Sequence, residues 1–192
     1  MKTVALGNIP AGESVIEISM PFGLRTDLEA CYLIGSFGTA YSGREARILP
    51  LPNRLNFGSV VNQGLAFYGA NIDYTVDVEL DSDGTLEIIA THYRGALIGV
   101  AVDGVDVGRI AFQPFTLRTP ALKKGKHRIT YTLFGTRYNT LTALHNLNAD
   151  KKRMYMGPIY WRSENEAWAY EYQTRPMGIL KTPILKFYKE EL

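Results

Sequence analysis

The Asp and Glu residues are the residues of this chain whose types and spacing most resemble catalytic groups. Asp73, Asp77 and Glu79 alternate with apolar residues, so they share one row that faces solvent if the segment is a strand. Further candidate acids stand in a turn and near the end of the chain: Asp81, Asp83, Glu164, Glu166 and Glu171. Hydrolysis of a glycosidic bond uses two carboxyl groups, and the one that acts as the acid has a raised pKa. None of these acids has apolar surroundings in the sequence that would raise its pKa, so we expect no catalytic pair within this chain.

Neither the acidic turn nor the histidines form a metal-binding pattern. Asp81, Asp83 and Gly84 resemble the beginning of a calcium-binding loop, but the twelfth position, which needs a Glu, is His92. The three histidines, His92, His127 and His145, are too widely spaced to predict a zinc site. We therefore predict no metal site and no cofactor, and structural calcium is not predicted.

Two of the histidines stand where two interpretations remain open. His92 precedes Arg94 at a predicted strand end, where it either contacts a ligand hydroxyl or terminates the strand. His145 and Asn146 follow an apolar stretch and either cap a loop or contact a ligand. His127 stands beside a turn rich in lysine, and we expect its ring to be exposed.

Aromatic residues gather toward the end of the chain. Trp161 and Trp168 bracket a polar loop, and four tyrosines stand close by: Tyr155, Tyr160, Tyr170 and Tyr172. The amphipathic rings of Trp and Tyr suit the apolar faces and hydroxyl groups of sugars. The alternative is that Trp168, Tyr170 and Tyr172 alternate along a strand as part of a core or an interface.

Composition excludes several classes of protein. The 192 residues are 46% hydrophobic and 21% charged, which is ordinary for a globular protein and argues against disorder. A net charge of +2, with only short basic runs, argues against a nucleic-acid binder. No apolar run is long enough to span a membrane, and residues 1–10 lack the apolar core of a secretory signal. The single cysteine, Cys31, excludes an intrachain disulfide, and we expect it to be a buried structural thiol.

Period-two patterns predict an antiparallel all-β fold. Ile72–Leu80 is the clearest strand, and Asp103–Gly104 suits the type I′ turn of a hairpin because both residues tolerate positive φ. The other predicted strands are 14–19, 28–34, 44–51, 85–91, 97–102, 105–112, 127–134, 168–172 and 184–187. Residues 139–147 are the one candidate helix. The strand number and spacing favour a β-sandwich of the jelly-roll type.

We predict three regions along the chain. Residues 12–18 match residues 125–131 in layout, because each begins with a turn glycine and continues as an alternating strand. Residues 1–35 are therefore interpreted as the closing strands of a preceding β-domain, although a chance likeness between two common turns explains the match equally well. Residues 36–56 are predicted to be a linker or an edge strand. Residues 57–192 are predicted to form the jelly-roll sandwich.

Several segments, taken in their order along the chain, resemble a known family. They are 33–38, 63–74, 98–112 with Pro114, 122–131, 137–145 and 170–180. This order is similar to the C-terminal region of large bacterial glycosidase-like proteins, whose sugar-binding domains have a galactose-binding-like jelly-roll fold, as in glycoside hydrolase family 2. The resemblance covers roughly residues 28–185. One departure is that Ala143–Leu144 stand where the family pattern has Gly-Pro before the histidine.

The resemblance implies a non-catalytic role, because such proteins carry their catalytic carboxylates in a separate barrel domain. We predict a carbohydrate-binding or accessory domain of a glycosidase-like protein, with a carbohydrate and the parent's catalytic domain as partners and a second copy of the chain left open. The candidate sugar contacts are Tyr68, His92, Arg94, His145, Asn146 and Trp161. The alternatives are a structural or interaction module without a sugar ligand and a self-standing hydrolase.

Overall fold

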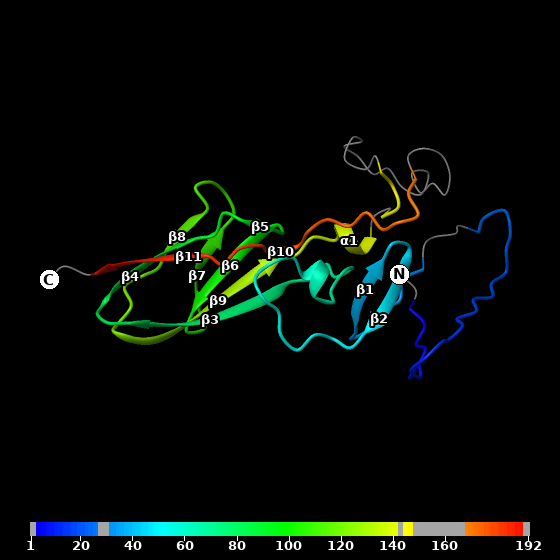
Figure 1. Ribbon diagram of the computed structural model, residues 1–192, viewed down its shortest axis with the longest axis horizontal. Helices are drawn as coiled ribbons and strands as arrows, with labels where there is room; N and C mark the ends of the chain where they lie inside the picture. Colours follow the sequence, from blue (N-terminus) through cyan, green and yellow to red (C-terminus); the bar gives the residue numbers. More distant parts are fainter. Residues whose placement is uncertain (1–2, 27–30, 142–143, 148–167, 190–192) are drawn as a thin grey trace. The chain divides into compact units, whose positions relative to one another are not determined.

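The computed structural model describes residues 3–26, 31–141, 144–147 and 168–189, and it divides the chain into two compact units (Figure 1). The first unit is Met1–Leu33 and the second is Ile34–Leu192.

The first unit forms no strand in its described residues. The expected strand over 14–19 is therefore wrong, and of the strand expected over 28–34 only residues 31–34 are described, none of which is in a strand. An alternating segment needs a neighbouring strand to bond its backbone, and Val15 is instead 90% exposed. Cys31 is exposed, so the expected burial of its thiol is also wrong. The assignment of residues 1–35 to a preceding β-domain stays a prediction.

The second unit is built almost entirely from short antiparallel strands. They are β1 (Gly38–Ser42), β2 (Glu45–Leu49), β3 (Ile72–Leu80), β4 (Gly84–Ile89), β5 (Tyr93–Arg94), β6 (Leu97–Val102), β7 (Val105–Ile110), β8 (Thr116–Arg118), β9 (Gly125–Phe134), β10 (Gly178–Ile179) and β11 (Ile184–Lys189). Two short helical turns, η1 (Val60–Gln63) and α1 (Tyr138–Leu141), interrupt them. Among the described residues, no helix has the length and apolar character to cross a membrane.

Two sheets share one hydrophobic core and make a β-sandwich, as the sequence predicts. One sheet has the order β3-β9-β6-β7 and the other has the order β11-β4-β8 (Figure 1). The alternation along β3 explains the packing, because Ile72, Tyr74 and Leu80 are buried while Asp73, Asp77 and Glu79 face solvent. The inner rows of both sheets meet in the core, where Ile88 of β4 and Ile129 of β9 are fully buried. The finer jelly-roll connectivity stays a prediction.

The hairpin of β6 and β7 confirms its predicted turn. Val102 pairs with Val105, so Asp103 and Gly104 form a two-residue loop. Their φ values of 51° and 81° are the positive values that a type I′ turn requires.

Three elements differ from the sequence expectations. Residues 36–56, expected to be a linker or an edge strand, contain the β1–β2 hairpin over residues 38–49, and β2 lies within the strand expected over 44–51. Trp168–Tyr172 is not a strand, because only Trp168 makes a bridge, to Asn146. The candidate helix over 139–147 is reduced to α1, and residues 144–147 are not helical.

Candidate functional site

Six rings from four separate segments gather in the second unit. We call this group the aromatic cluster, and its members are Tyr41, Phe67, His145, Trp168, Tyr170 and Tyr172. The Tyr172 ring lies 5.4 Å from Tyr41, 5.0 Å from Phe67 and 4.6 Å from His145, measured between centroids. His145 stacks on Trp168 at 5.4 Å, and Tyr170 meets Trp168 edge-on at 4.5 Å. These spacings fall in the range of favourable aromatic pairs.

Backbone hydrogen bonds hold the segments that carry these rings. The amide of Ala169 donates to the carbonyl of His145 at 2.8 Å, and the amide of Tyr172 donates to Gly43 after β1 at 3.2 Å. Within β1, the amide of Thr39 donates to the carbonyl of Gly64 at 2.7 Å, and this bond positions the segment that carries Phe67. The cluster is therefore anchored to the β1–β2 hairpin.

A buried amide fixes the segment that follows the cluster. The side chain of Asn139, in α1, is buried. Its Nδ2 donates to the carbonyl of Arg175 at 2.7 Å, and its Oδ1 accepts from the Arg175 amide at 2.9 Å. The Tyr41 hydroxyl lies 2.7 Å from Oγ1 of Thr174 in the same segment. Both contacts restrain residues 174–175 and therefore the nearby Tyr172.

The hydrogen bond of His145 assigns its tautomer. Nδ1 lies 3.0 Å from the carbonyl oxygen of Ala169, an acceptor, so Nδ1 carries the proton in the neutral ring. Nε2 is then an acceptor, and no described residue donates to it. A ligand hydroxyl group is the kind of donor that this nitrogen can accept.

Exposure divides the aromatic cluster into a supported part and an open part. Trp168 and Tyr172 are half-buried, Ala169 between them is buried, and Tyr170 is 62% exposed. The Tyr170 and Trp168 rings thus offer an apolar surface that the rest of the cluster supports, with Asn146 paired to Trp168 beside it. Such a surface can stack against the apolar face of a sugar ring.

The structure separates the six residues predicted from sequence into different places. His145 and Asn146 lie in or beside the aromatic cluster, whereas His92 and Arg94 lie at β5, which pairs with β10. Tyr68 packs against the core and donates its hydroxyl to the carbonyl of Asn71 at 3.0 Å. Trp161 lies outside the described residues. Their roles in sugar binding stay predictions.

Sequence reasoning missed two members of the cluster. Tyr41 falls in the region that we interpreted as a linker or an edge strand, and Phe67 falls in a family-like segment in which only Tyr68 was selected. Phe67 lies in a turn that the Tyr68 amide closes by donating to the carbonyl of Leu65 at 3.2 Å. A turn has no strand periodicity, so no alternation in the sequence separates the core-packed Tyr68 from Phe67 in the cluster.

Asp77 and Asp83, two of the acids singled out in the sequence, have the wrong electrostatics for a general acid. A hydrogen bond from the Arg128 guanidinium lowers the pKa of Asp77, and one from the Lys123 ammonium lowers the pKa of Asp83. Both carboxyl groups thus stay ionised at neutral pH, whereas a glycosidase acid needs the opposite shift. In the part of the chain that the structure describes, no three His, Cys, Asp or Glu side chains are placed to hold a metal ion.

Comparisons with known proteins give matches among solved structures only. No family model matches the chain, and no curated protein matches it. The structure is similar to a rhamnosidase from Novosphingobium sp. PP1Y, with a TM-score of 0.43 and 16% identity over 81% of this chain and 15% of that one.

Two structures of a GH2 beta-galacturonidase from Eisenbergiella tayi are also similar. The one bound to glycerol has a TM-score of 0.39 and 20% identity, and the one bound to galacturonate has a TM-score of 0.38 and 18% identity. Each match covers 78% of this chain and 22% of the enzyme. The chain therefore spans less than a quarter of the length of the rhamnosidase and of the beta-galacturonidase.

Proposed function

We propose that this chain is a non-catalytic carbohydrate-binding domain and that the aromatic cluster is its binding site. The observation that carries the proposal is the open pair of rings formed by Tyr170 and Trp168, beside a histidine whose Nε2 is an acceptor. An apolar platform next to polar groups is the arrangement that a sugar ring needs, because the sugar presents C–H groups on its faces and hydroxyls on its rim.

The support beneath the platform favours binding over simple packing. The platform formed by Tyr170 and Trp168 is supported by a chain of ring contacts. His145 packs on Trp168, and Tyr172 packs on His145. Tyr172 in turn contacts the rings of Tyr41 and Phe67. Binding to rings that are already fixed in place costs less conformational entropy than binding that must first order them. The role as an accessory domain of a larger glycosidase-like protein is part of the proposal and rests on the order of the family-like segments.

Replacing Tyr170 by Ala tests the site. Tyr170 is largely exposed and contacts one edge of Trp168, so its removal should leave the fold intact while it deletes half of the platform. A glycan array identifies the ligand, and isothermal titration calorimetry then measures its affinity. We expect Tyr170→Ala to weaken binding by about tenfold, the value of one well-formed aromatic contact.

Tyr188 provides the matched control. It is an exposed tyrosine on β11, in the β11-β4-β8 sheet, which carries no ring of the aromatic cluster, and its hydroxyl donates to Glu87 at 3.0 Å. Tyr188→Ala should keep the affinity of the unaltered chain. Equal losses in the two variants, or an affinity that Tyr170→Ala leaves unchanged, would place the sugar elsewhere. A complete absence of glycan binding would end the carbohydrate proposal.

A structural or interaction module is the second candidate. Large apolar side chains are exposed along the first unit, and Val15, Phe22 and Leu24 are among them. Such residues favour contact with another protein surface. This candidate predicts no saturable binding to any glycan, together with oligomers or complexes that dissociate when these apolar residues are replaced.

A further inference from the structure

A second exposed surface lies at one end of the sandwich, where three segments meet. The amide of Ala90 donates to the carbonyl of Phe115 at 3.0 Å, which joins residues 90–96 to the loop 111–115 between β7 and β8. The amide of Leu180 donates to the carbonyl of His92 at 2.8 Å, which joins the first segment to residues 176–183 around β10.

The charge of this surface has one sign. The three segments carry His92, Arg94 and Lys181, and their sequences contain neither Asp nor Glu. Arg94 and Lys181 are both exposed, and none of the described carboxylates lies within ion-pairing distance of either side chain. Elsewhere on the sandwich, Arg109 pairs with Asp106 and Arg128 pairs with Asp77, whereas Arg118 lies over the Tyr188 ring. These two unpaired cations are therefore available to an anion from outside.

The pairing of β5 with β10 sets the direction of the polar side chains. Tyr93 faces the core opposite the fully buried Ile179. Because strand residues alternate, Arg94 lies on the opposite face from Tyr93, and the exposed His92 stands directly before β5. The His92 ring has its Nδ1 2.8 Å from the Thr91 hydroxyl, and Nε2 has no described partner. Arg94 donates only to its neighbouring carbonyl, that of Tyr93, at 3.2 Å.

The adjoining loop presents an aromatic ring to solvent. Phe112 is 86% exposed, although it is a large apolar side chain in the well-packed unit. The loop is closed by a 2.8 Å hydrogen bond from the Phe115 amide to the Phe112 carbonyl, and the Phe115 ring packs edge-on against Tyr93. Phe115 has a φ of 59°, a left-handed conformation that is unfavourable for a bulky residue. A strained turn that displays an exposed ring is a feature found at ligand sites.

We propose that His92, Arg94, Phe112 and Lys181 form a second ligand site, the β5 site, which takes an acidic sugar such as a uronic acid. Phe112 stacks on the apolar face of the sugar ring, Arg94 binds the carboxylate through its planar fork, and Lys181 adds positive charge. The β5 site deepens the proposed carbohydrate function and rests on it, but it uses a different surface from the aromatic cluster.

Calorimetry with matched sugars tests the β5 site. The probes are trimers of galacturonic, glucuronic and mannuronic acid, each beside its neutral counterpart, with hexaglutamate as an acidic ligand that is not a sugar. We expect at least one uronic trimer to bind at least tenfold more tightly than its neutral counterpart, with an affinity that falls as salt rises. Hexaglutamate should bind at least tenfold more weakly than that trimer.

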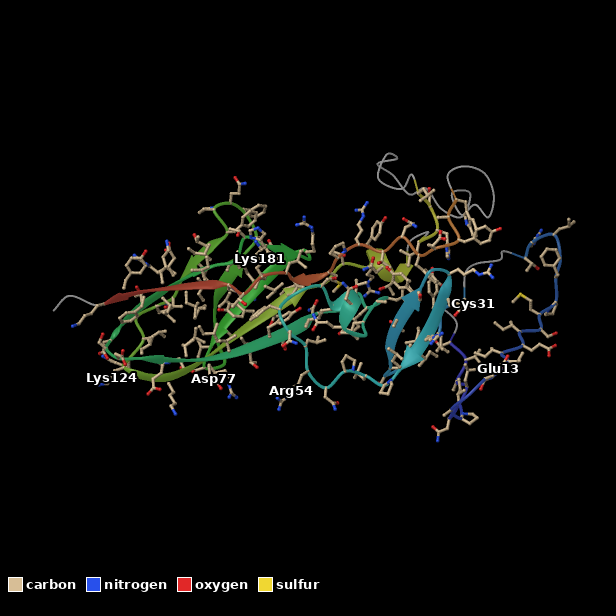
Figure 2. The ribbon with its side chains drawn as sticks, viewed as in Figure 1. Glu13, Cys31, Arg54, Asp77, Lys124 and Lys181 are labelled. Atoms are coloured by element: carbon tan, nitrogen blue, oxygen red, sulfur yellow. The ribbon has the colours of Figure 1, made fainter. Side chains whose placement is uncertain are left out.

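Four variants locate the binding. Arg94→Gln and Phe112→Ala should each weaken binding of the uronic trimer about tenfold. Lys181→Gln should weaken it about threefold, because a single flexible ammonium contributes less than a bidentate contact. Lys124→Gln removes the same charge from an exposed lysine at the turn before β9, away from Lys181 in Figure 2, and should leave the affinity unchanged.

Each other result overturns the β5 site. If no uronic trimer binds, or if the neutral trimers or hexaglutamate bind equally well, the surface does not select acidic sugars. If Lys124→Gln matches Lys181→Gln, the effect is one of overall charge. If Tyr170→Ala abolishes binding of the uronic trimer while Arg94→Gln leaves it unchanged, the sugar binds at the aromatic cluster. The β5 site then fails and the proposed function stands. If no glycan of any kind binds, both fail.

Discussion

At the scale of single residues, His127 is held more tightly than its sequence position predicts. We expected an exposed ring, but only 12% of its side chain is exposed. Nε2 lies 2.7 Å from the carbonyl of Lys123 and Nδ1 lies 2.7 Å from the Asp103 carboxylate, so both ring nitrogens face acceptors. The Lys123 carbonyl first and the Asp103 carboxylate second raise the pKa of His127, because both stabilise the protonated ring.

This arrangement makes the contribution of His127 to stability depend on pH. Its folded pKa lies above the ordinary value of about 6.5, so its contribution is complete below that value and is lost as pH rises through the folded pKa. We expect His127→Gln to lower the free energy of unfolding most at pH 5–6 and least at pH 8–9, as measured by urea denaturation. Asp103→Asn should flatten the same dependence. A loss that stays constant with pH, or that grows toward high pH, would contradict this account.

At the scale of the elements, an alternating pattern in the sequence predicts a strand correctly where a neighbouring strand bonds to it along its whole length. Ile72–Leu80 is a strand with the predicted bounds, and it pairs along its whole length with β9. Trp168–Tyr172 has the same alternation but forms no strand. The amides of Ala169 and Tyr172 bond to two different segments, at His145 and Gly43, so no continuous ladder forms.

The turn of the β6–β7 hairpin gives a prediction for an element. Gly104 has a φ of 81°, and a Cβ added there meets no atom within 4 Å. Gly104→Ala should therefore lower the free energy of unfolding by about 1 kcal/mol through backbone strain alone. Gly104→Asn should lower the free energy of unfolding less, because Asn tolerates the left-handed region better than Ala. Equal stability of the alanine variant and the unaltered chain in urea denaturation would show that the turn relaxes.

The candidate site shows why sequence could identify only part of it. Trp168, Tyr170 and Tyr172 stand together in the sequence, so their grouping is visible without a structure. Tyr41 and Phe67 join them only because the β1–β2 hairpin bonds to the chain around Gly64 and Tyr172. Contacts between distant segments of this kind leave no local pattern, and this is why residues 36–56 were interpreted as a linker or an edge strand.

At the scale of the whole molecule, the hydrophobic core belongs to the second unit alone. Every residue of the core cluster falls between Leu55 and Leu185. The first unit exposes its apolar side chains and forms no strand in its described residues. Since burial of apolar surface is the main source of stability, the second unit should fold without the first.

Deletion of residues 1–33 tests this independence. We expect the shortened chain to unfold cooperatively, with a Tm within about 2 °C of that of the full chain in differential scanning calorimetry. It should also aggregate less, because exposed apolar residues such as Val15 and Phe22 are removed. A Tm that falls by about 8 °C or more, or a chain that no longer folds, would show that the first unit supports the sandwich.

The most direct test of the central claim is tryptophan fluorescence during a glycan titration. The chain contains two tryptophans, so a Trp161→Phe variant leaves Trp168, within the aromatic cluster, as the single reporter. The account predicts a saturable change in Trp168 emission with a ligand identified on the array, and a titration shifted about tenfold to higher concentration by Tyr170→Ala. Saturable glycan binding by calorimetry with Trp168 emission unchanged, or no glycan binding at all, would contradict it.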